Sequence, residues 1–481
     1  MSALDGSFLR LESRRAHMHM GFSAVFASPS RDRQRPAVEL LRERVAGRLH
    51  GVPWCRWRLD DAPLGLSEPR WVEDSEFDLA AHIVQLTQPG DRVSYECFEA
   101  LRSAVLSTPL DRSRPLWQIF LVPLLQDGRV GMVGKIHHAL ADGIAALQIV
   151  RLVVDDEPDA RTESPVGWQP HGRVGAVGWV LGTLEHAVED GLAAARTGAG
   201  ALARPKATTQ RALRGAKGMV GAVEDVLARA PRSALNGPTG PRRTLVGYHA
   251  RRDELRAARA GGGTLNDVGL AVVAGALRAL SLREGESPAH PLKAMIPVNM
   301  RALGDAAAGN QFSMLNIGLP VHLAIAQERL DWVRGQTNLL KYTDRPASTY
   351  ALYRAGGLLP SPLRGPVVRA LSAPRVFNLT VSQSPAPRGP LYLLGCELQE
   401  VYSVVPIAQD HALAIGMVRY NQELFFGCHA EPHALPAVYD LPAMLEAEVL
   451  ALGDPRTSGA TPATPAASAN VKPAVTVPAT T

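Results

Sequence analysis

The chain has 481 residues, of which 46% are hydrophobic and 20% charged, so it is too long for one compact core and too apolar for a disordered protein. Its formal net charge of +5 is too small to indicate a nucleic-acid-binding protein. The four cysteines lack the spacing of a zinc or redox site, which favours a reducing compartment. Asp5 and Glu12 interrupt the N-terminus where a secretory signal would be apolar, so we expect a cytoplasmic protein.

Residues 1–155 are predicted to form a first lobe. The stretches 116–124 and 129–136 have the composition of two strands, and the sequence Gln-Asp-Gly at 126–128 predicts a hairpin turn between them. An apolar helix is expected at 144–154.

Residues 156–243 differ from this first lobe in composition. Gly, Ala and Pro are frequent and aromatic residues nearly vanish, which predicts a long crossover or mobile linker. Between residues 191 and 222 there is no acidic side chain, and the basic residues are Arg196, Arg204, Lys206, Arg211, Arg214 and Lys217. We name 191–222 the cationic stretch.

Residues 244–453 are predicted to form a second lobe. Helical patterns alternate there with strands expected at 292–298, 312–319, 376–381, 391–402, 411–420 and 423–429. The expected class is therefore mixed α/β. Residues 454–481 are rich in Ala, Thr and Pro, so we expect a disordered tail.

The most informative motif is His137-His138 followed by Asp142-Gly143, between the predicted strand 129–136 and the predicted helix 144–154. Loops between a strand and a helix often present reactive groups, and a helix N-terminus has a positive potential. That potential disfavours a protonated imidazole, so a histidine here is a candidate general base.

Simpler interpretations of the same residues exist. Each histidine alone could be a hydrogen-bonded packing residue, and Asp142 could cap the helix. The whole string, however, is expected by chance in only roughly two chains per thousand of this length. A zinc site at His137, His138 and Asp142 is disfavoured because adjacent histidines diverge and no second ligand cluster is evident.

At this motif the chain resembles the bacterial wax ester synthase/diacylglycerol acyltransferase family, which belongs to the HHxxxDG group of CoA-dependent acyltransferases. Other segments resemble that family in the same order along the chain: Leu4-Asp5-Gly6-Ser7-Phe8-Leu9, Met18-His19-Met20-Gly21, Pro109-Leu110-Asp111, Arg114-Pro115-Leu116-Trp117, Leu235-Asn236-Gly237-Pro238, Asn266-Asp267, Pro297-Val298-Asn299-Met300-Arg301, Gly309-Asn310-Gln311, and Pro390-Leu391-Tyr392-Leu393 with Gly395.

The resemblance implies two lobes related to chloramphenicol acetyltransferase, with mixed sheets, a long crossover linker and a tunnel that meets at His138. It implies transfer of a fatty acyl group from acyl-CoA to the hydroxyl of diacylglycerol or a long-chain alcohol, without a metal or redox cofactor. The cationic stretch is then a merely solvated surface, a contact for an anionic membrane or lipid droplet, or an attractor of CoA phosphates. Of the two functional interpretations, we favour the membrane.

The resemblance also assigns roles to the motif residues. His138 is the expected general base, and His137 shapes the loop. Asp142 is expected to fix the loop, next to Gly143 at the helix start, through an ion pair for which Arg301 is the suggested partner.

Other matched residues have two interpretations each. Asn266, beside Asp267 of the same motif, either donates to the tetrahedral oxyanion or caps the helix, with Thr264 as the competing cap. Trp117 either packs the interface between the lobes or lines an acyl tunnel.

The chain also departs from the family pattern. Residues 378–387 lack the usual Asn-Val-Pro-Gly-Pro turn, and Asn299 replaces an expected serine. One alternative function is a condensation-type acyltransferase that uses a carrier-protein thioester, although no fused carrier segment is visible. Another is a catalytically silent protein of lipid surfaces, which the presence of His138 and Asp142 disfavours.

Overall fold

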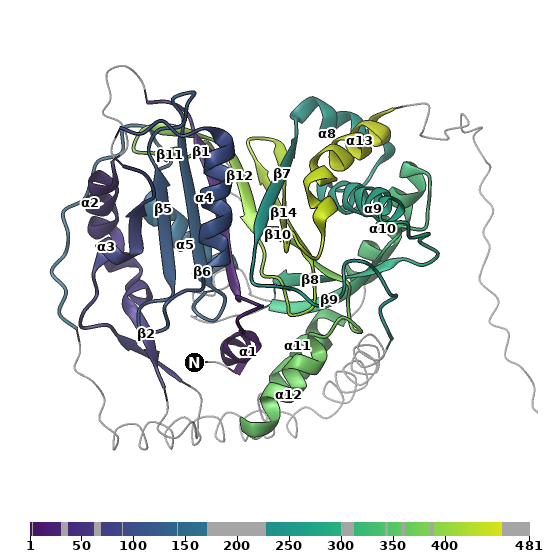
Figure 1. Ribbon diagram of the computed structural model, residues 1–481, viewed down its shortest axis with the longest axis horizontal. Helices are drawn as coiled ribbons and strands as arrows, with labels where there is room; N and C mark the ends of the chain where they lie inside the picture. The colour runs from purple at the N-terminus through teal and green to yellow at the C-terminus, as the bar shows by residue number, and fades with distance from the viewer. Residues whose placement is uncertain are drawn as a thin grey trace, which may run out of the picture.

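A computed structural model describes residues 1, 3–29, 37–61, 69–88, 90–141, 143–170, 228–299, 312–341, 345–356, 361–384 and 389–454. The cationic stretch and all of the predicted tail after Asp454 lie outside these residues. The described chain forms two lobes side by side, each built on its own six-stranded sheet with helices packed against it (Figure 1). Each sheet contains both parallel and antiparallel pairs, so the predicted mixed α/β class is confirmed.

The first lobe is built on the sheet β11 (Tyr392–Leu393), β12 (Cys396–Val404), β1 (His19–Phe26), β6 (Val130–His137), β5 (Trp117–Val122) and β4 (Ile83–Gln85) in that order. Its helices are α1 (Ala3–Leu11), α2 (Val38–Arg48), α3 (Leu79–His82), α4 (Tyr95–Ser107) and α5 (Gly143–Val153), with a small hairpin of β2 (Trp57–Asp60) and β3 (Arg70–Glu73). Two short 3-10 helices, Leu49–Gly51 and Pro53–Arg56, connect α2 to β2.

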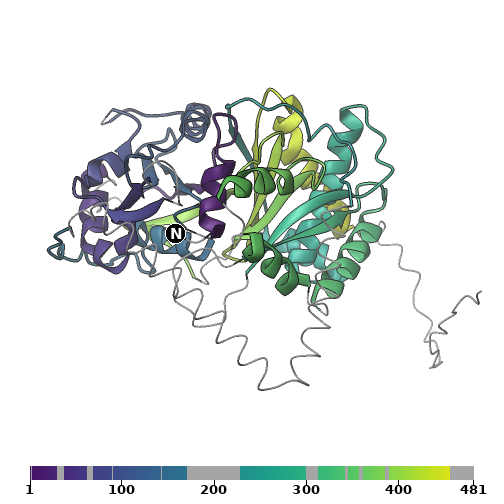
Figure 2. The same ribbon diagram turned by 90° about the horizontal axis from the view of Figure 1, so that it is seen from below.

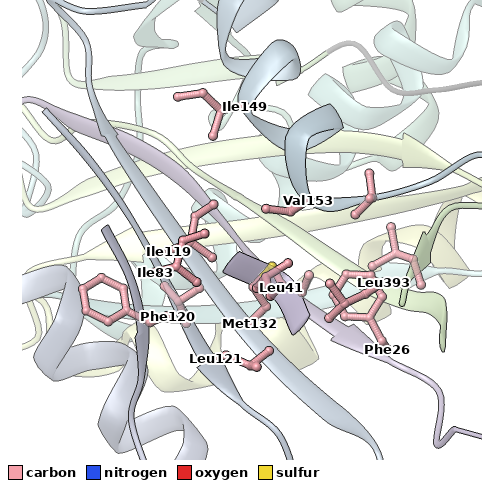
Figure 3. Close-up of a cluster of buried hydrophobic side chains, with 14 of the residues drawn as sticks. Phe26, Leu41, Ile83, Ile119, Phe120, Leu121, Met132, Ile149, Val153 and Leu393 are labelled. Atoms are coloured by element: carbon pink, nitrogen blue, oxygen red, sulfur yellow. The ribbon is translucent and has the colours of Figure 1, made fainter. Parts of the chain in front are cut away.

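Strand β6 is the centre of this lobe and carries the histidine motif at its end. It pairs antiparallel with β5, which confirms the predicted hairpin, and every one of its residues is buried. Met132 lies in the apolar core with Leu41 of α2 and with Ile149 and Val153 of α5 (Figure 3). The opposite face of β6 contacts α4, so both faces of the strand are covered.

The second lobe is built on the sheet β7 (Thr244–Ala250), β14 (Glu423–Ala430), β13 (Leu413–Tyr420), β10 (Leu379–Ser384), β8 (Leu292–Asn299) and β9 (Phe312–Leu319) in that order. Its helices are α8 (Arg252–Ala258), α9 (Leu265–Arg283), α10 (Ala326–Lys341), α11 (Arg345–Gly356), α12 (Ser361–Leu371) and α13 (Leu441–Gly453), with 3-10 turns at Arg259–Gly261 and Pro436–Asp440. The strands predicted at 312–319 and 423–429 are confirmed almost to the residue, whereas β10 begins later than expected because Val376 lies in a turn.

Helix α9 has the length and composition of a membrane-spanning helix. However, 72% of its apolar window is buried inside the fold, which is the environment of a core helix. Helices α10 and α13 pack against it.

One strand crosses from the second half of the chain into the first lobe. The predicted strand 391–402 is broken by a turn at Leu394-Gly395, where both residues have positive φ, into β11 and β12. β12 then pairs antiparallel with β1, so that Gly21 lies opposite Val404. Residues 392–404 are predicted to belong to the second lobe but are part of the first sheet.

In addition to its pairing with β1, β12 packs on the second sheet, where it contacts a row of glycines. Gly247, Gly427 and Gly416 are cross-strand neighbours on β7, β14 and β13. A Cβ atom on Gly427 would lie 2.5 Å from the carbonyl oxygen of Ser403, and one on Gly247 would lie 2.3 Å from the ring of Tyr402. The absence of side chains on these three residues lets the two lobes meet through β12.

The described start of the predicted linker, residues 156–170, packs on the first lobe. Arg44 of α2 donates to Oγ1 of Thr162 at 3.1 Å and to the carbonyl oxygen of Ala160 at 2.8 Å. The guanidinium of Arg56 stacks on the ring of Trp168 at 4.8 Å. The far end of the linker is held in the second lobe, where the side chain of Asn236 donates to the carbonyl oxygen of Asn378 at 3.0 Å.

Candidate active site

The predicted motif lies where β6 ends and the chain turns into α5. His137 is the last residue of β6 and lies opposite His19 of β1. The backbone N–H of His138 donates to the carbonyl oxygen of Met18 at 2.8 Å, so the turn is held against the start of β1. Gly143 is the first residue of α5, which confirms the predicted helix after the motif.

The ring of His138 is half-buried and lies flat on another ring. Phe8 of α1 stacks on it with the centroids 4.0 Å apart and the planes 7° from parallel. The apolar cluster around Phe8 includes Ala139 and Leu140 from the turn and Met314 from β9 of the second lobe. Figure 2 shows the purple α1 between the two lobes, and α1 contacts α11 and α12 of the second lobe. The half-buried imidazole therefore lies beside a junction of the two lobes.

His137, in contrast, is 1% exposed and has a defined tautomer. Its Nδ1 accepts from the backbone N–H of Ala139 at 3.0 Å, so the ring proton of a neutral His137 is on Nε2. This Nε2 lies 3.5 Å from Oε1 of Glu12. Sequence reasoning missed Glu12 as a site residue because no local pattern connects it to β6.

Glu12 is held in turn by an arginine. Nε of Arg112 donates to Oε2 of Glu12 at 2.7 Å, and Nη2 of the same arginine contacts the same oxygen. Burial raises the pKa of Glu12, but His137 and Arg112 lower it by more, so the net shift is downward. Glu12 is therefore ionised at neutral pH.

Two further buried histidines lie near this carboxylate. Desolvation by burial lowers the pKa of His17 and lowers that of His19 well below its ordinary value. Nε2 of His19 accepts from the backbone N–H of Leu110 at 3.2 Å. Both rings are therefore neutral packing residues at neutral pH.

Asp142 and Arg301 lie outside the described residues, so the suggested ion pair between them stays a prediction. Trp117 is fully buried, its Nε1 donates to the carbonyl oxygen of Cys55 at 2.7 Å, and its ring stacks on His82 with centroids 4.7 Å apart. These contacts of Trp117 are all within the first lobe.

The interpretation of Asn266 as a helix cap is wrong. Helix α9 begins at Leu265 and is capped by Thr264, whose Oγ1 accepts from the backbone N–H of Asp267 at 3.2 Å. Asn266 is the second residue of the helix and is half-buried. Oδ1 of Asp267 accepts from Oγ1 of Thr337 at 2.7 Å, which ties α9 to α10.

Among the described residues, no group of three His, Cys, Asp or Glu side chains is placed to hold a metal ion. The zinc interpretation would need Asp142, which lies outside them.

Known proteins resemble the chain over nearly its whole length. Residues 1–269 match the wax ester synthase/diacylglycerol acyltransferase catalytic domain, and residues 308–452 match the C-terminal domain of the same family. A putative diacylglycerol O-acyltransferase of Mycobacterium tuberculosis is 31% identical over 93% of this chain and 90% of its own length. A probable diacylglycerol O-acyltransferase of the same species is 27% identical over 90% of each chain.

Solved structures share the fold. The wax ester synthase/diacylglycerol acyltransferase from Marinobacter aquaeolei VT8 superposes with a TM-score of 0.66 at 24% identity, covering 95% of this chain and 98% of the other. The first condensation domain of the calcium-dependent antibiotic synthetase gives 0.59 at 17% identity, covering 96% and 97%.

Proposed function

Because the chain belongs to the wax ester synthase/diacylglycerol acyltransferase family, and is therefore an acyltransferase, we propose that it transfers a fatty acyl group from acyl-CoA to the hydroxyl of diacylglycerol or a long-chain alcohol. The observation that carries this proposal is the half-buried ring of His138 directly after β6, stacked on Phe8, whose apolar cluster includes Met314 of the second lobe. An acyl donor and an acceptor that enter between the lobes would meet at this ring.

His138 is the proposed general base. An alcohol is a poor nucleophile at neutral pH, so a neutral imidazole must take its proton as the oxygen attacks the thioester carbonyl. The new C–O bond gives a tetrahedral oxyanion, for which Asn266 is the proposed hydrogen-bond donor. When the intermediate collapses, the C–S bond breaks, and the proton on His138 passes to the CoA sulfur. These steps need no metal or redox cofactor.

The direct test is release of free CoA from palmitoyl-CoA with and without an alcohol. We expect release that depends on diacylglycerol or hexadecanol, and His138→Ala should lower its rate by about 100-fold or more with the melting temperature unchanged. His290→Ala is the matched control, since His290 is exposed and lies just before β8. A wild-type rate in His138→Ala would remove the assigned base, and no alcohol-dependent release with any acceptor would favour a catalytically silent protein.

A carrier-protein thioester is the second candidate donor. It is favoured only by the shared fold with a condensation domain. Palmitoyl-CoA and a palmitoyl carrier protein offered at equal concentration would separate the two donors. We expect the CoA thioester to react faster.

We also propose that the protein associates peripherally with the inner face of the plasma membrane or with lipid inclusions. An uncharged ester or triacylglycerol is insoluble in water and must leave into lipid, and the cationic stretch would favour an anionic surface. Co-sedimentation with vesicles that contain phosphatidylglycerol should exceed that with phosphatidylcholine alone. Equal binding to both would contradict the electrostatic part of the proposal.

A further inference from the structure

We propose that Glu12 is a positioning residue, whose carboxylate holds the Nε2–H of His137 and thereby fixes the turn that presents His138. This inference rests on the proposed function, because it assigns a role within the same site. Neither the motif nor the family comparison in this chain assigns a role to Glu12.

The carboxylate is fixed from two sides. Glu12 follows α1 directly, and its backbone N–H donates to the carbonyl oxygen of Phe8 at 3.0 Å. Arg112 binds Oε2 and also donates to the carbonyl oxygen of Leu9 at 3.1 Å. Because Arg112 takes Oε2, the other oxygen, Oε1, is left to face the histidines.

Two histidines approach Oε1, but only one of them offers it a proton. Nε2 of His19 is 3.9 Å away and already accepts from Leu110, so it presents a lone pair. Nε2 of His137 is 3.5 Å away and carries the ring proton, because Nδ1 accepts from Ala139. The buried Nε2 makes no hydrogen bond to a described residue, and at 3.5 Å the Glu12 carboxylate is the acceptor that faces it.

The ring of His137 shapes the turn in which His138 lies. Nδ1 of His137 accepts from the backbone N–H of Ala139, and the backbone carbonyl oxygen of His137 accepts from the N–H of Leu140 at 2.9 Å. If the ring changed its tautomer, the N–H of Ala139 would lose its acceptor and the turn would loosen. The same N-terminal segment places Phe8 on the ring of His138, so residues 8–12 support both histidines.

Glu12→Gln tests this arrangement because an amide has only one acceptor oxygen. That oxygen can serve Arg112 or His137 but not both, and the amide N–H groups would then face a donor. We expect kcat for alcohol-dependent CoA release to fall by about 10- to 100-fold, with KM for acyl-CoA within about twofold of wild type. Glu400→Gln is the matched control: Glu400 is also half-buried and accepts from an arginine, Arg129, at 2.6 Å, but lies opposite Val25 near the far end of β1.

A second measurement requires no active variant. Wild-type protein labelled with ¹⁵N-histidine is measured by NMR, and the His137 signal is assigned by its loss in His137→Asn. We expect this signal to be that of the Nε2–H tautomer. An Nδ1–H tautomer, or a kcat of Glu12→Gln within about twofold of wild type, would overturn the inference. If wild-type protein releases no CoA with any alcohol, the proposed function fails, and a comparison of the His137 signal in wild type and in Glu12→Gln still decides whether Glu12 holds His137.

Discussion

Lys135 is a buried cation two residues before the histidine pair, on the same face of β6 as His137. It is 1% exposed, and its Nζ donates to the carbonyl oxygens of Val105 at 3.2 Å and Thr108 at 2.8 Å at the end of α4. Carbonyl groups at a helix C-terminus favour a cation. Burial nevertheless lowers the pKa of Lys135 to about 8.

The lowered pKa predicts how the stability of the protein depends on alkaline pH. Between pH 8 and the ordinary lysine pKa of about 10.5, the unfolded chain binds the proton that the folded chain has lost, so stability rises with pH. Relative to Lys135→Met, the free energy of unfolding of wild type should gain about 2 kcal/mol between about pH 7.5 and about pH 9.5. Urea unfolding at both values measures it, and a constant difference would mean that the ammonium group is solvated.

At this scale the sequence predicts local chemistry and misses contacts between distant segments. His137 and His138 are recognisable because a seven-residue string contains both and the adjoining helix. Glu12 and Phe8 reach the pair only after α1 folds onto the end of β6, so no spacing reveals them.

Among the predicted strands, β12 has a partner that the sequence does not predict. Its apolar pattern identifies a strand, but its partner β1 is at the other end of the chain, and pairing over such a separation leaves no local signal. β5 and β6, or β13 and β14, are joined by short turns, so their pairing can be predicted.

Two glycine-to-alanine substitutions, one in the glycine row that contacts β12 and one in α10, should have opposite effects on stability. Gly427→Ala would press a methyl group against Ser403 and should destabilise the protein by about 1 to 3 kcal/mol. Gly335→Ala, inside α10 with open space around it, should instead stabilise it by roughly 0.5 to 1 kcal/mol. Urea midpoints of the two variants measure this, and equal effects would mean that β12 does not constrain the second sheet.

The molecule as a whole buries several histidines in neutral form, and His429 is the clearest case. It lies on β14, 4% exposed, and a ring nitrogen, Nδ1, donates to the carbonyl oxygen of Val405 at 2.7 Å. Burial first, then the charge of Arg243 and that of His17 once it is protonated in acid, lower the pKa of His429 to about 3. His17 lies just before β1 of the first lobe and His429 on β14 of the second, so the contact between the lobes is sensitive to acid.

Acid should therefore destabilise the wild-type protein more than a variant without this ring. Below the ordinary histidine pKa of about 6.5 the unfolded chain takes up a proton that the folded chain refuses, so stability falls as pH falls towards 3. His429→Asn keeps a donor for Val405. Between about pH 6 and about pH 4.5 the free energy of unfolding of His429→Asn should fall by about 2 kcal/mol less than that of wild type. Urea unfolding at both pH values measures this difference. Equal losses in the two proteins would contradict the burial of a neutral ring.

The pairing of β12, from the second half of the chain, with β1 also has a consequence for biosynthesis. Until residue 404 has left the ribosome, β1 is an open edge of the first sheet, since its neighbour on that side has not yet been made. The nascent N-terminal half is thus exposed to unwanted strand pairing throughout most of translation, a period in which a chaperone could cover that edge.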